Sequence, residues 1–536
     1  MTVKSLRHLA AALIAASLTT GAGAQTLSDS NLEFTGLRTS GTLSRPIAFV
    51  FLNNTGTDFL IAEQATGQVK RMTNGVVSST IALDLAVNLG SLSERGLLCL
   101  VADPQFATNG YVYVYYSPSS TSSDTTANAS IGSNHIVARY TWNSVNGLLE
   151  NRTVIQSDLP ITGGPNHNGG VMVFGPPSAA PADQKLFIII GDLNRNNQNE
   201  NYPSGLAPDG SANVLRINSD GTIPTDNPFY NVPGANSYLQ RMYAYGIRNS
   251  FGMTFDPLST PNNLWDTENG TNDYDEINLV APSFNSGWEY WMGPQSRGFH
   301  PTQTGGLTQY GGLGTYSDPE FSFRVPPALA AIYFVDGNGL GPDYYGDCIV
   351  ADYNNARLYK FEMNAQRSGF VFNSSVLQDL VYDSADSGSL SEILFGTNFG
   401  GITSMKTGAD GKLYAVSLGG NQIYRIQRKA NLPTPSPTPS PSPSSTPSLT
   451  PSASPSPSVS PSATPSLSPT ETATPSPTAS PTASATPTVS PSATPSPTPW
   501  VITYPTDFIN AAPFTLEDDD LNTDGIVDCS DITPPK

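Results

Sequence analysis

The amino-acid sequence predicts an all-β protein, with a six-bladed β-propeller over residues 25–430. Three observations favour this fold: six apolar segments look alike, each holds three strand-like runs separated by turn residues, and no helical periodicity lies between them. Antiparallel units repeated in this way pack face to face around a channel and leave only short edges exposed. A pair of β-sandwich domains is the alternative that the same strands allow.

The six segments follow one another between residues 45 and 428. Each has an apolar first strand, a second strand rich in Val, Ile, Tyr or Phe, and a third strand. The second strands are expected to begin near Phe59, Tyr111, Leu186, Leu264, Cys348 and Leu413. These starts lie farther apart than a minimal blade requires. The surplus residues are expected in loops gathered at one end of the channel, where a functional site is to be sought.

The composition changes sharply after the last segment. Of 47 Pro residues, 21 lie between Pro433 and Pro499, in a stretch made almost wholly of Pro, Ser, Thr and Ala. Such a stretch cannot bury a core that offsets the entropy of ordering it, so residues 431–499 are expected to be a disordered linker. Residues 500–536 then form a short acidic tail.

Charge and the first residues indicate where the protein acts. The 44 acidic and 25 basic residues leave a net charge of −19, which is the wrong sign for binding nucleic acid or anionic lipid. Residues 1–24 read as a secretory signal peptide, with a basic start, a short apolar run and a small-residue cleavage site. A membrane anchor is the alternative, but the run is too short to span a bilayer, and no later segment is long enough. We therefore expect a secreted or cell-surface protein.

Cysteine usage does not indicate a disulfide framework. The chain has three widely separated cysteines, Cys99, Cys348 and Cys529. We expect Cys99 and Cys348 to be small buried apolar residues.

Candidate catalytic residues precede or follow predicted strands. His167 lies in Asn-His-Asn-Gly-Gly before the first strand of the third segment, and Asp192 ends the second strand of that segment. A carboxylate that orients an imidazole is the arrangement of a general base. A hydrogen-bonded structural histidine and a turn-capping aspartate are the alternatives.

A second group of candidates lies in the fourth segment. Arg248 and Asn249 precede its first strand, and an acidic, Gly-containing loop follows its second strand from Glu268 to Glu276. Oxygen-rich loops of this kind suit Ca²⁺. A polar hairpin turn is the alternative.

Several long motifs occur in one order: His-Asn-Gly-Gly with a strand ending Gly-Asp, ANVLRINSDGTIPTDNPF, YGIRNSFGMTFDP and TENGTNDYDEINLVAPSFNSGW. With these motifs the chain resembles the glucose/sorbosone dehydrogenase family from about Leu37 to Arg428. The resemblance implies a secreted six-bladed propeller of a kind that often uses pyrroloquinoline quinone and Ca²⁺ to oxidise aldose sugars.

The resemblance also implies roles for single residues. His167 would take the proton of the anomeric hydroxyl while hydride passes to the quinone, and Asp192 would orient His167. Arg248 and Asn249 would contact the quinone. The backbone carbonyls of Gly270 and Thr271 would hold one Ca²⁺, and Glu276 matches a ligand of a second, structural Ca²⁺.

The chain departs from the family pattern at positions that usually carry positive charge. Val171 and Ile247 replace an Arg and a His, and Gly401, Thr403 and Asn354 stand where cations usually neutralise the quinone carboxylates. Substitutes from neighbouring positions are Arg357, Lys360 or Lys406. A propeller that binds glycans or proteins without redox chemistry is therefore the alternative function.

The acidic tail contains one calcium-loop pattern. Its side-chain oxygens, together with one backbone carbonyl, come from Asp520, Asn522, Asp524, Ile526, Asp528 and Asp531. The aspartate at the last position resembles dockerin repeats, which anchor secreted proteins on cohesin-like partner modules. A dockerin needs two such loops, and an unstructured acidic tail is the alternative.

Overall fold

The computed structural model describes residues 23–90, 93–162, 164–195, 201, 207–297, 306–383 and 390–430. The predicted linker 431–499 and the tail 500–536, with its calcium loop, lie outside these residues, as does nearly all of the predicted signal peptide. No helix in the described ranges is long and apolar enough to cross a bilayer.

The described residues form six antiparallel blades, as the sequence predicts. Blade 1 consists of β3(Pro46–Phe51), β4(Asp58–Glu63), β5(Gln68–Thr73) and β6(Val76–Asp84). Blade 2 consists of β7(Leu97–Ala102), β8(Tyr111–Tyr116), β9(Asn134–Asn143) and β10(Leu148–Pro160). Blade 3 consists of β11(Met172–Gly175), β12(Lys185–Ile190), β13(Asn213–Ile217) and β14(Met242–Tyr245). Blade 4 consists of β15(Ser250–Phe255), β16(Leu264–Glu268), β17(Asp275–Leu279) and β20(Phe321–Phe323). Blade 5 consists of β21(Leu329–Phe334), β22(Cys348–Asp352), β23(Leu358–Met363) and β26(Leu394–Thr397). Blade 6 consists of β27(Ile402–Thr407), β28(Leu413–Ser417), β29(Gln422–Arg428) and β2(Leu32–Gly36).

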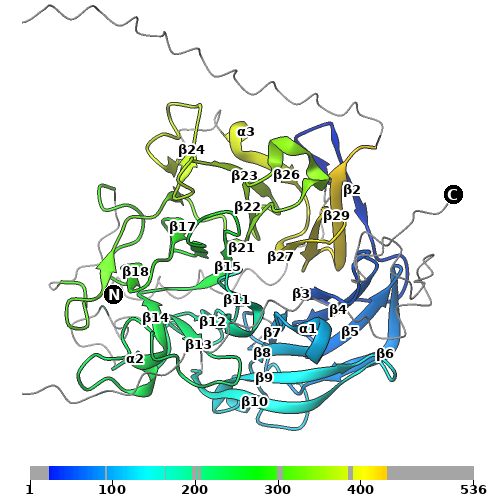
Figure 1. Cartoon of the computed structure of the whole chain (residues 1–536), viewed down its shortest axis with the longest axis horizontal. Coiled ribbons are helices and arrows are strands. Elements are labelled where there is room, and N and C mark those ends of the chain that lie inside the picture. Colours follow the sequence, from blue (N-terminus) through cyan, green and yellow to red (C-terminus); the bar gives the residue numbers. More distant parts are fainter. Residues whose placement is uncertain are drawn as a thin grey trace, which may run out of the picture. The chain divides into compact units, whose positions relative to one another are not determined.

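The blades close into a ring. The first strands of successive blades contact one another from β3 to β27, and β27 contacts β3 again. In Figure 1 these six strands lie around the middle of the molecule. The N-terminal segment completes the last blade of the ring, because β2 pairs with β29 from Leu32↔Arg428 to Gly36↔Tyr424.

Short strands extend three blades at their outer edges. These are β1(Thr26–Leu27), β18(Phe284–Asn285), β19(Thr315–Tyr316) and β25(Val381–Tyr382). A further short strand, β24(Phe370–Val371), pairs with β23 within blade 5. The helices are single turns in loops: α1(Phe106–Asn109), α2(Ser237–Arg241) and α3(Leu390–Ile393).

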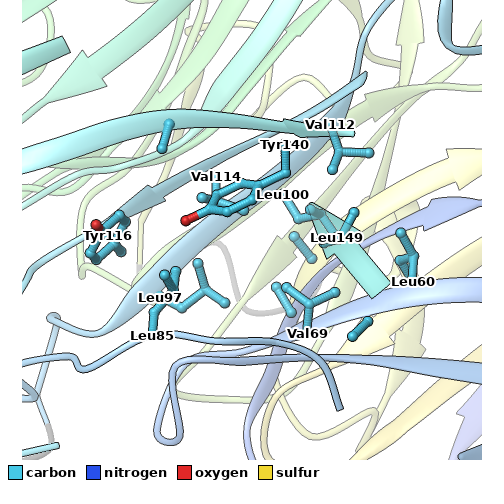
Figure 2. Packing of buried hydrophobic residues seen from close by; sticks show 14 of the residues in the cluster. Leu60, Val69, Leu85, Leu97, Leu100, Val112, Val114, Tyr116, Tyr140 and Leu149 are labelled. Atoms are coloured by element: carbon cyan, nitrogen blue, oxygen red, sulfur yellow. The ribbon is translucent and has the colours of Figure 1, made fainter. Parts of the chain in front are cut away.

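Apolar side chains fill the junctions between neighbouring blades. Figure 2 shows the junction of blades 1 and 2, where Leu60 and Val69 meet Leu97, Leu100 and Val112. Each of the other five junctions has a cluster of its own. Strand side chains alternate between the two faces of a blade, so both faces can be apolar and each blade can pack on two neighbours. The free thiols of Cys99 and Cys348 belong to these clusters, as expected.

Candidate active site at one end of the propeller

The predicted site residues gather at one end of the channel. In an antiparallel blade the start of the first strand and the end of the second strand lie at the same end of the blade. His167 precedes β11 and Asp192 follows β12, whereas Arg248 precedes β15 and Gly270 follows β16. Blades 3 and 4 are neighbours, and the two pairs meet where Asp192 N donates to the carbonyl of Arg248 at 2.8 Å.

His167 and Asp192 form a buried hydrogen-bonded pair. Nδ1 of His167 lies 2.6 Å from Oδ1 of Asp192, and the histidine is only 6% exposed. The carboxylate is held in place, since Oδ2 accepts from Nε1 of Trp288 at 2.8 Å and Oδ1 accepts from Asn194 N at 2.7 Å. An ionised Asp192 keeps the proton on Nδ1, which leaves the lone pair of Nε2 free to accept a proton.

The backbone of His167 is held in an uncommon conformation. Its φ is 59°, in the left-handed region. Its carbonyl accepts from Leu193 N at 3.2 Å, and its N–H donates to Oε2 of Glu94 at 2.5 Å. Gly191 allows this close packing, because a Cβ there would lie 2.5 Å from the carbonyl oxygen of His167 and 2.7 Å from that of Arg248.

Glu94 is a site residue that the sequence analysis missed. It reaches from the loop before β7 and joins three blades, since Oε2 also accepts from Nδ2 of Asn249 at 3.1 Å. Oδ1 of Asn249 in turn accepts from Gly169 N at 3.3 Å. Burial raises the pKa of Glu94, against the favourable charges of His167 and Arg248. The sequence signal that could have found Glu94 was its position. Like His167 and Arg248, Glu94 is an ionisable residue shortly before the first strand of a blade.

The Arg248 side chain packs beside the His167–Asp192 pair. Its guanidinium lies over the ring of Trp288, 5.4 Å from the centroid, and NH1 donates to the carbonyls of Asn269 at 2.8 Å and Gly270 at 2.6 Å. Nε is buried without a partner in the described part of the chain. Desolvation lowers the pKa of Arg248. An arginine with one unsatisfied buried donor is suited to an anionic or oxygen-rich ligand.

The predicted calcium ligands are only partly arranged for a metal. The Gly270 carbonyl faces Arg248, so Ca²⁺ at this oxygen requires the guanidinium to move, and Thr271 is exposed. Glu276 is buried, and its Oε1 accepts from Gly293 N at 2.5 Å. In the described ranges no three Asp, Glu, His or Cys side chains are grouped closely enough to hold a metal ion. The two calcium sites remain predictions.

Blade 4 carries a group of buried carboxyl groups beside the predicted calcium ligand Glu276. Asp266, Glu268 and Glu276 lie on β16 and β17, and Glu320 precedes β20. Burial first, and then repulsion between neighbours, raises their pKa values, to about 7 for Glu276 and about 8 for Glu320. Both oxygens of Asp266 lack a hydrogen-bond partner in the described ranges. These groups therefore favour protonation or a cation over free negative charge.

The structure shows what surrounds two of the positions that depart from the family pattern, and what pairs with one of the candidate substitute cations. Ile247 packs in the core between blades 3 and 4. Gly401 has φ 73°, and a Cβ there would lie 2.9 Å from Cδ2 of Tyr353, so the tyrosine ring occupies the space where a longer side chain would begin. Lys360 is paired with Asp347 at 2.9 Å and is therefore not a substitute cation.

The fold and the site together define a six-bladed β-propeller that holds a hydrogen-bonded histidine–aspartate pair and an adjacent arginine at one end of its channel. The chain belongs to the glucose/sorbosone dehydrogenase family: the family model described as Glucose / Sorbosone dehydrogenase matches residues 43–425.

Curated relatives agree with this assignment, and a solved structure shares the fold. The chain is 32% identical over 248 residues to Quinoprotein glucose dehydrogenase B of Acinetobacter calcoaceticus, over 42% of this chain and 47% of the relative. It is 30% identical over 249 residues to Aldose sugar dehydrogenase YliI of Escherichia coli, over 46% of this chain and 59% of the relative. The chain thus spans about half the length of the curated relatives it matches. The crystal structure of the soluble aldose sugar dehydrogenase of Escherichia coli in its apo-form has the same fold, with a TM-score of 0.55 at 21% identity over 74% of this chain and all of the other.

The residues present fit the anionic quinone that the family implies. Arg248 offers an unsatisfied buried donor next to the His167 loop. Asn249 uses Oδ1 and one Nδ2 hydrogen within the protein, which leaves one amide hydrogen for a ligand. Trp288 offers an aromatic ring against which Arg248 is already fixed. Arg248, Asn249 and Trp288 are the residues that would hold such a group.

Proposed function

We propose that this chain is an exported quinoprotein oxidoreductase that oxidises the anomeric hydroxyl of aldose sugars, with pyrroloquinoline quinone and Ca²⁺ as cofactors. The observation that carries the proposal is the 2.6 Å contact of His167 Nδ1 with Asp192, which leaves Nε2 as a proton acceptor beside Arg248. Family membership supports the same reaction class.

Each residue of the candidate site has a separate role in the proposed reaction. Nε2 of His167 accepts the proton of the sugar's anomeric hydroxyl, and the buried Asp192 carboxylate stabilises the resulting imidazolium. Trp288 and Asn194 fix that carboxylate, and Glu94 fixes the backbone of His167. When bound, the quinone supplies the acceptor for the hydride that leaves the anomeric carbon, so the sugar loses two electrons and two hydrogens in all.

Calcium is proposed at the carbonyls of Gly270 and Thr271. Binding there would replace the hydrogen bond that Arg248 makes to Gly270 and would free one NH1 hydrogen for a ligand, while NH1 keeps its bond to the carbonyl of Asn269. The loop supports this exchange, since Gly270 N donates to Oδ1 of Asp275 at 2.9 Å and Oδ2 of Asp275 accepts from Leu329 N at 3.0 Å. The loop geometry therefore does not depend on Arg248 alone.

A second candidate function is a propeller that binds glycans or proteins without redox chemistry. The observation that favours it is the ring of Tyr353, which is 39% exposed and covers Gly401 at a position where the family usually has a cation. The experiment that separates the two is reconstitution with quinone and Ca²⁺, followed by dye reduction with a panel of aldoses. Sugar-dependent reduction supports the oxidoreductase, whereas glycan binding without reduction supports the second candidate.

The tail is proposed as an anchor. A calcium loop at residues 520–531 after a Pro-rich linker suits a module that docks on a cohesin-like or cell-surface partner. This proposal rests on the sequence pattern.

A further inference from the structure

The loop that carries His167 runs outside the sheets, from the end of β10 to the start of β11. We call its residues 162 and 164–167 the base loop. On the side of blade 3, Oγ1 of Thr162 donates to the carbonyl of Leu193 at 3.1 Å, and Leu193 N donates to the carbonyl of His167 at 3.2 Å. Because no strand ladder in the described ranges includes the base loop, contacts of this kind set its position.

On the side of blade 2, three consecutive residues before β7 bind the base loop. Oγ of Ser93 donates to Oδ1 of Asn166 at 2.7 Å, and Oε2 of Glu94 accepts from His167 N at 2.5 Å. The third residue, Arg95, binds the base loop nearer to its start. Blade 2 therefore holds the loop of the proton acceptor at several adjacent points.

Arg95 binds two carbonyl groups of the base loop at once. The residue is fully buried, and its NH2 donates to the carbonyl oxygens of Thr162 and Gly164. NH1 donates to Oδ1 of Asn88 at 3.3 Å. A planar guanidinium fixes the directions of its N–H groups, so it fixes where both carbonyls lie. Gly164 is three residues before His167, and the contact thus sets the path of the chain that leads to the base.

The segment that carries Arg95 is itself held by blade 1. Nε2 of Gln64, the residue after β4, donates to the carbonyls of Ser93 at 2.9 Å and Arg95 at 3.1 Å. The carbonyl of Gln64 accepts from Leu97 N at 3.2 Å, and a Cβ on Gly96 would lie only 2.2 Å from that oxygen. The segment is therefore fixed on both sides, and the Arg95 guanidinium extends from a rigid support.

The charge of Arg95 is not balanced by a carboxylate in the described part of the chain. It meets two carbonyl oxygens and one amide oxygen, whereas Arg241 and Arg367 each pair with an aspartate. Desolvation lowers the pKa of Arg95. A buried charge without a counter-charge costs free energy of desolvation that an ion pair would partly offset. This cost indicates a role for Arg95 in the site rather than in the stability of the fold alone.

We propose that Arg95 is a positioning residue that places Nε2 of His167 for its reaction with the sugar. Arg95 acts through the base loop, since it is fully buried and bonds to the backbone of that loop. A shift of a reacting group by about 1 Å can lower a rate about 100-fold. The inference rests on the proposed function and deepens it, because it identifies the group that sets where the proton acceptor lies.

Arg95→Lys tests this role in the full-length chain reconstituted with quinone and Ca²⁺. The lysine keeps the positive charge, but its ammonium group is a point charge that does not fix two carbonyls in one plane. We expect the turnover number to fall about 10- to 100-fold while KM for the sugar stays within about threefold, because the misplaced base affects the transition state rather than sugar binding. A merely structural residue would not produce this split.

A second measurement does not need the quinone. The full-length chain is labelled with ¹⁵N in its four histidines, and His167→Asn assigns the ring signals of His167. We expect Arg95→Lys to shift or broaden these signals, because a base loop that is held less firmly lets the imidazole sample more than one position.

Arg367→Lys is the matched control. Arg367 also joins separate acceptors, Asp256 and the carbonyl of Gly346, but Asp256 follows the end of β15, at the opposite end of the blade from the site. This variant is expected to lower the melting temperature and to leave the turnover number and the His167 signals unchanged.

The outcomes separate this inference from the proposed function. Wild-type turnover and unchanged His167 signals in Arg95→Lys overturn the role of Arg95 and leave the proposed function standing. An equal loss of turnover in Arg367→Lys, or an Arg95→Lys chain that does not fold, overturns it too, since Arg95 is then structural. A wild type without sugar-dependent reduction overturns the proposed function, whereas altered His167 signals in Arg95→Lys still support the positioning of the ring.

Discussion

At the level of single residues, the candidate site depends on how His167 is held. Its ring is fixed through Asp192, which is itself fixed by Trp288, and its backbone is fixed through Glu94. A base whose tautomer and position are set before substrate arrives needs no reorganisation during the reaction. This preorganisation accounts for a conformation with positive φ at a residue other than glycine.

The first prediction concerns His167→Asn. Asn tolerates a positive φ and can donate to Asp192, but it cannot accept the proton. We expect the turnover number of the reconstituted enzyme to fall by a factor of about 10² to 10⁴, with the melting temperature nearly unchanged. Steady-state dye reduction and thermal unfolding measure the two quantities, and a parallel loss of both would identify His167 as a structural residue.

At the level of elements, β9 contains a histidine that must stay neutral. His135 is fully buried, with Nδ1 3.1 Å from Oγ of Ser117 and its ring against Tyr115. Burial, with a smaller contribution from the charge of Arg95, lowers its pKa to about 3. The unfolded chain takes up this proton near the ordinary value of about 6.5, well before the folded chain does.

The second prediction follows from that difference. Because the folded-state pKa of His135 is depressed, its neutral form contributes stability that is complete above about pH 6.5 and is lost as the pH falls toward about 3. We expect the free energy of unfolding of the wild type, relative to His135→Gln, to fall by about 1.4 kcal/mol per pH unit in this window. Urea unfolding between pH 4 and 8 measures this difference, and parallel curves for the two chains would contradict it.

The strands show how far the sequence could predict the structure. The first three strands of every blade were predictable, because they are apolar and follow one another in the chain. The fourth strands were missed for three reasons. β14, β20 and β26 are only three or four residues long, and β2 comes from the opposite end of the propeller sequence. β6 and β10 are longer, but runs of exposed residues interrupt their apolar pattern. His167, Asp192, Arg248 and Gly270 were predicted as one site, and the structure brings them together. The role of Glu94 depends on contacts with two other blades, which sequence spacing does not encode.

At the level of the whole molecule, closure of the ring depends on β2. Leu32 belongs to the core between blades 5 and 6, and β2 covers the outer edge of β29. Without β2, blade 6 has three strands and an exposed edge.

The third prediction tests this closure by truncation. Removal of residues 25–36 is expected to lower the melting temperature by several degrees or more, since the strand ladder of β2 and the buried Leu32 side chain are lost. Removal of residues 431–536 serves as the control, because we predict that the linker and tail contribute nothing to the propeller core. Equal melting temperatures for the chain lacking residues 25–36 and the wild type would contradict the closing role of β2.

The fourth prediction concerns the calcium loop of the tail. The sequence from Asp507 to Asp531 has eight carboxylates and no basic residue, so Ca²⁺ at the loop relieves repulsion that otherwise opposes order. We expect amide resonances of residues 520–531 to shift on addition of millimolar Ca²⁺ and to return with chelator. Spectra unaffected by Ca²⁺ would remove the sequence evidence for docking.

Quinone- and sugar-dependent dye reduction tests the central claim most directly. Purified full-length chain is incubated with pyrroloquinoline quinone and Ca²⁺, and reduction of an artificial electron acceptor is followed with a panel of aldoses. The account predicts reduction that requires sugar, quinone and His167 together. Quinone binding without sugar-dependent reduction, or reduction that survives His167→Asn undiminished, would contradict it.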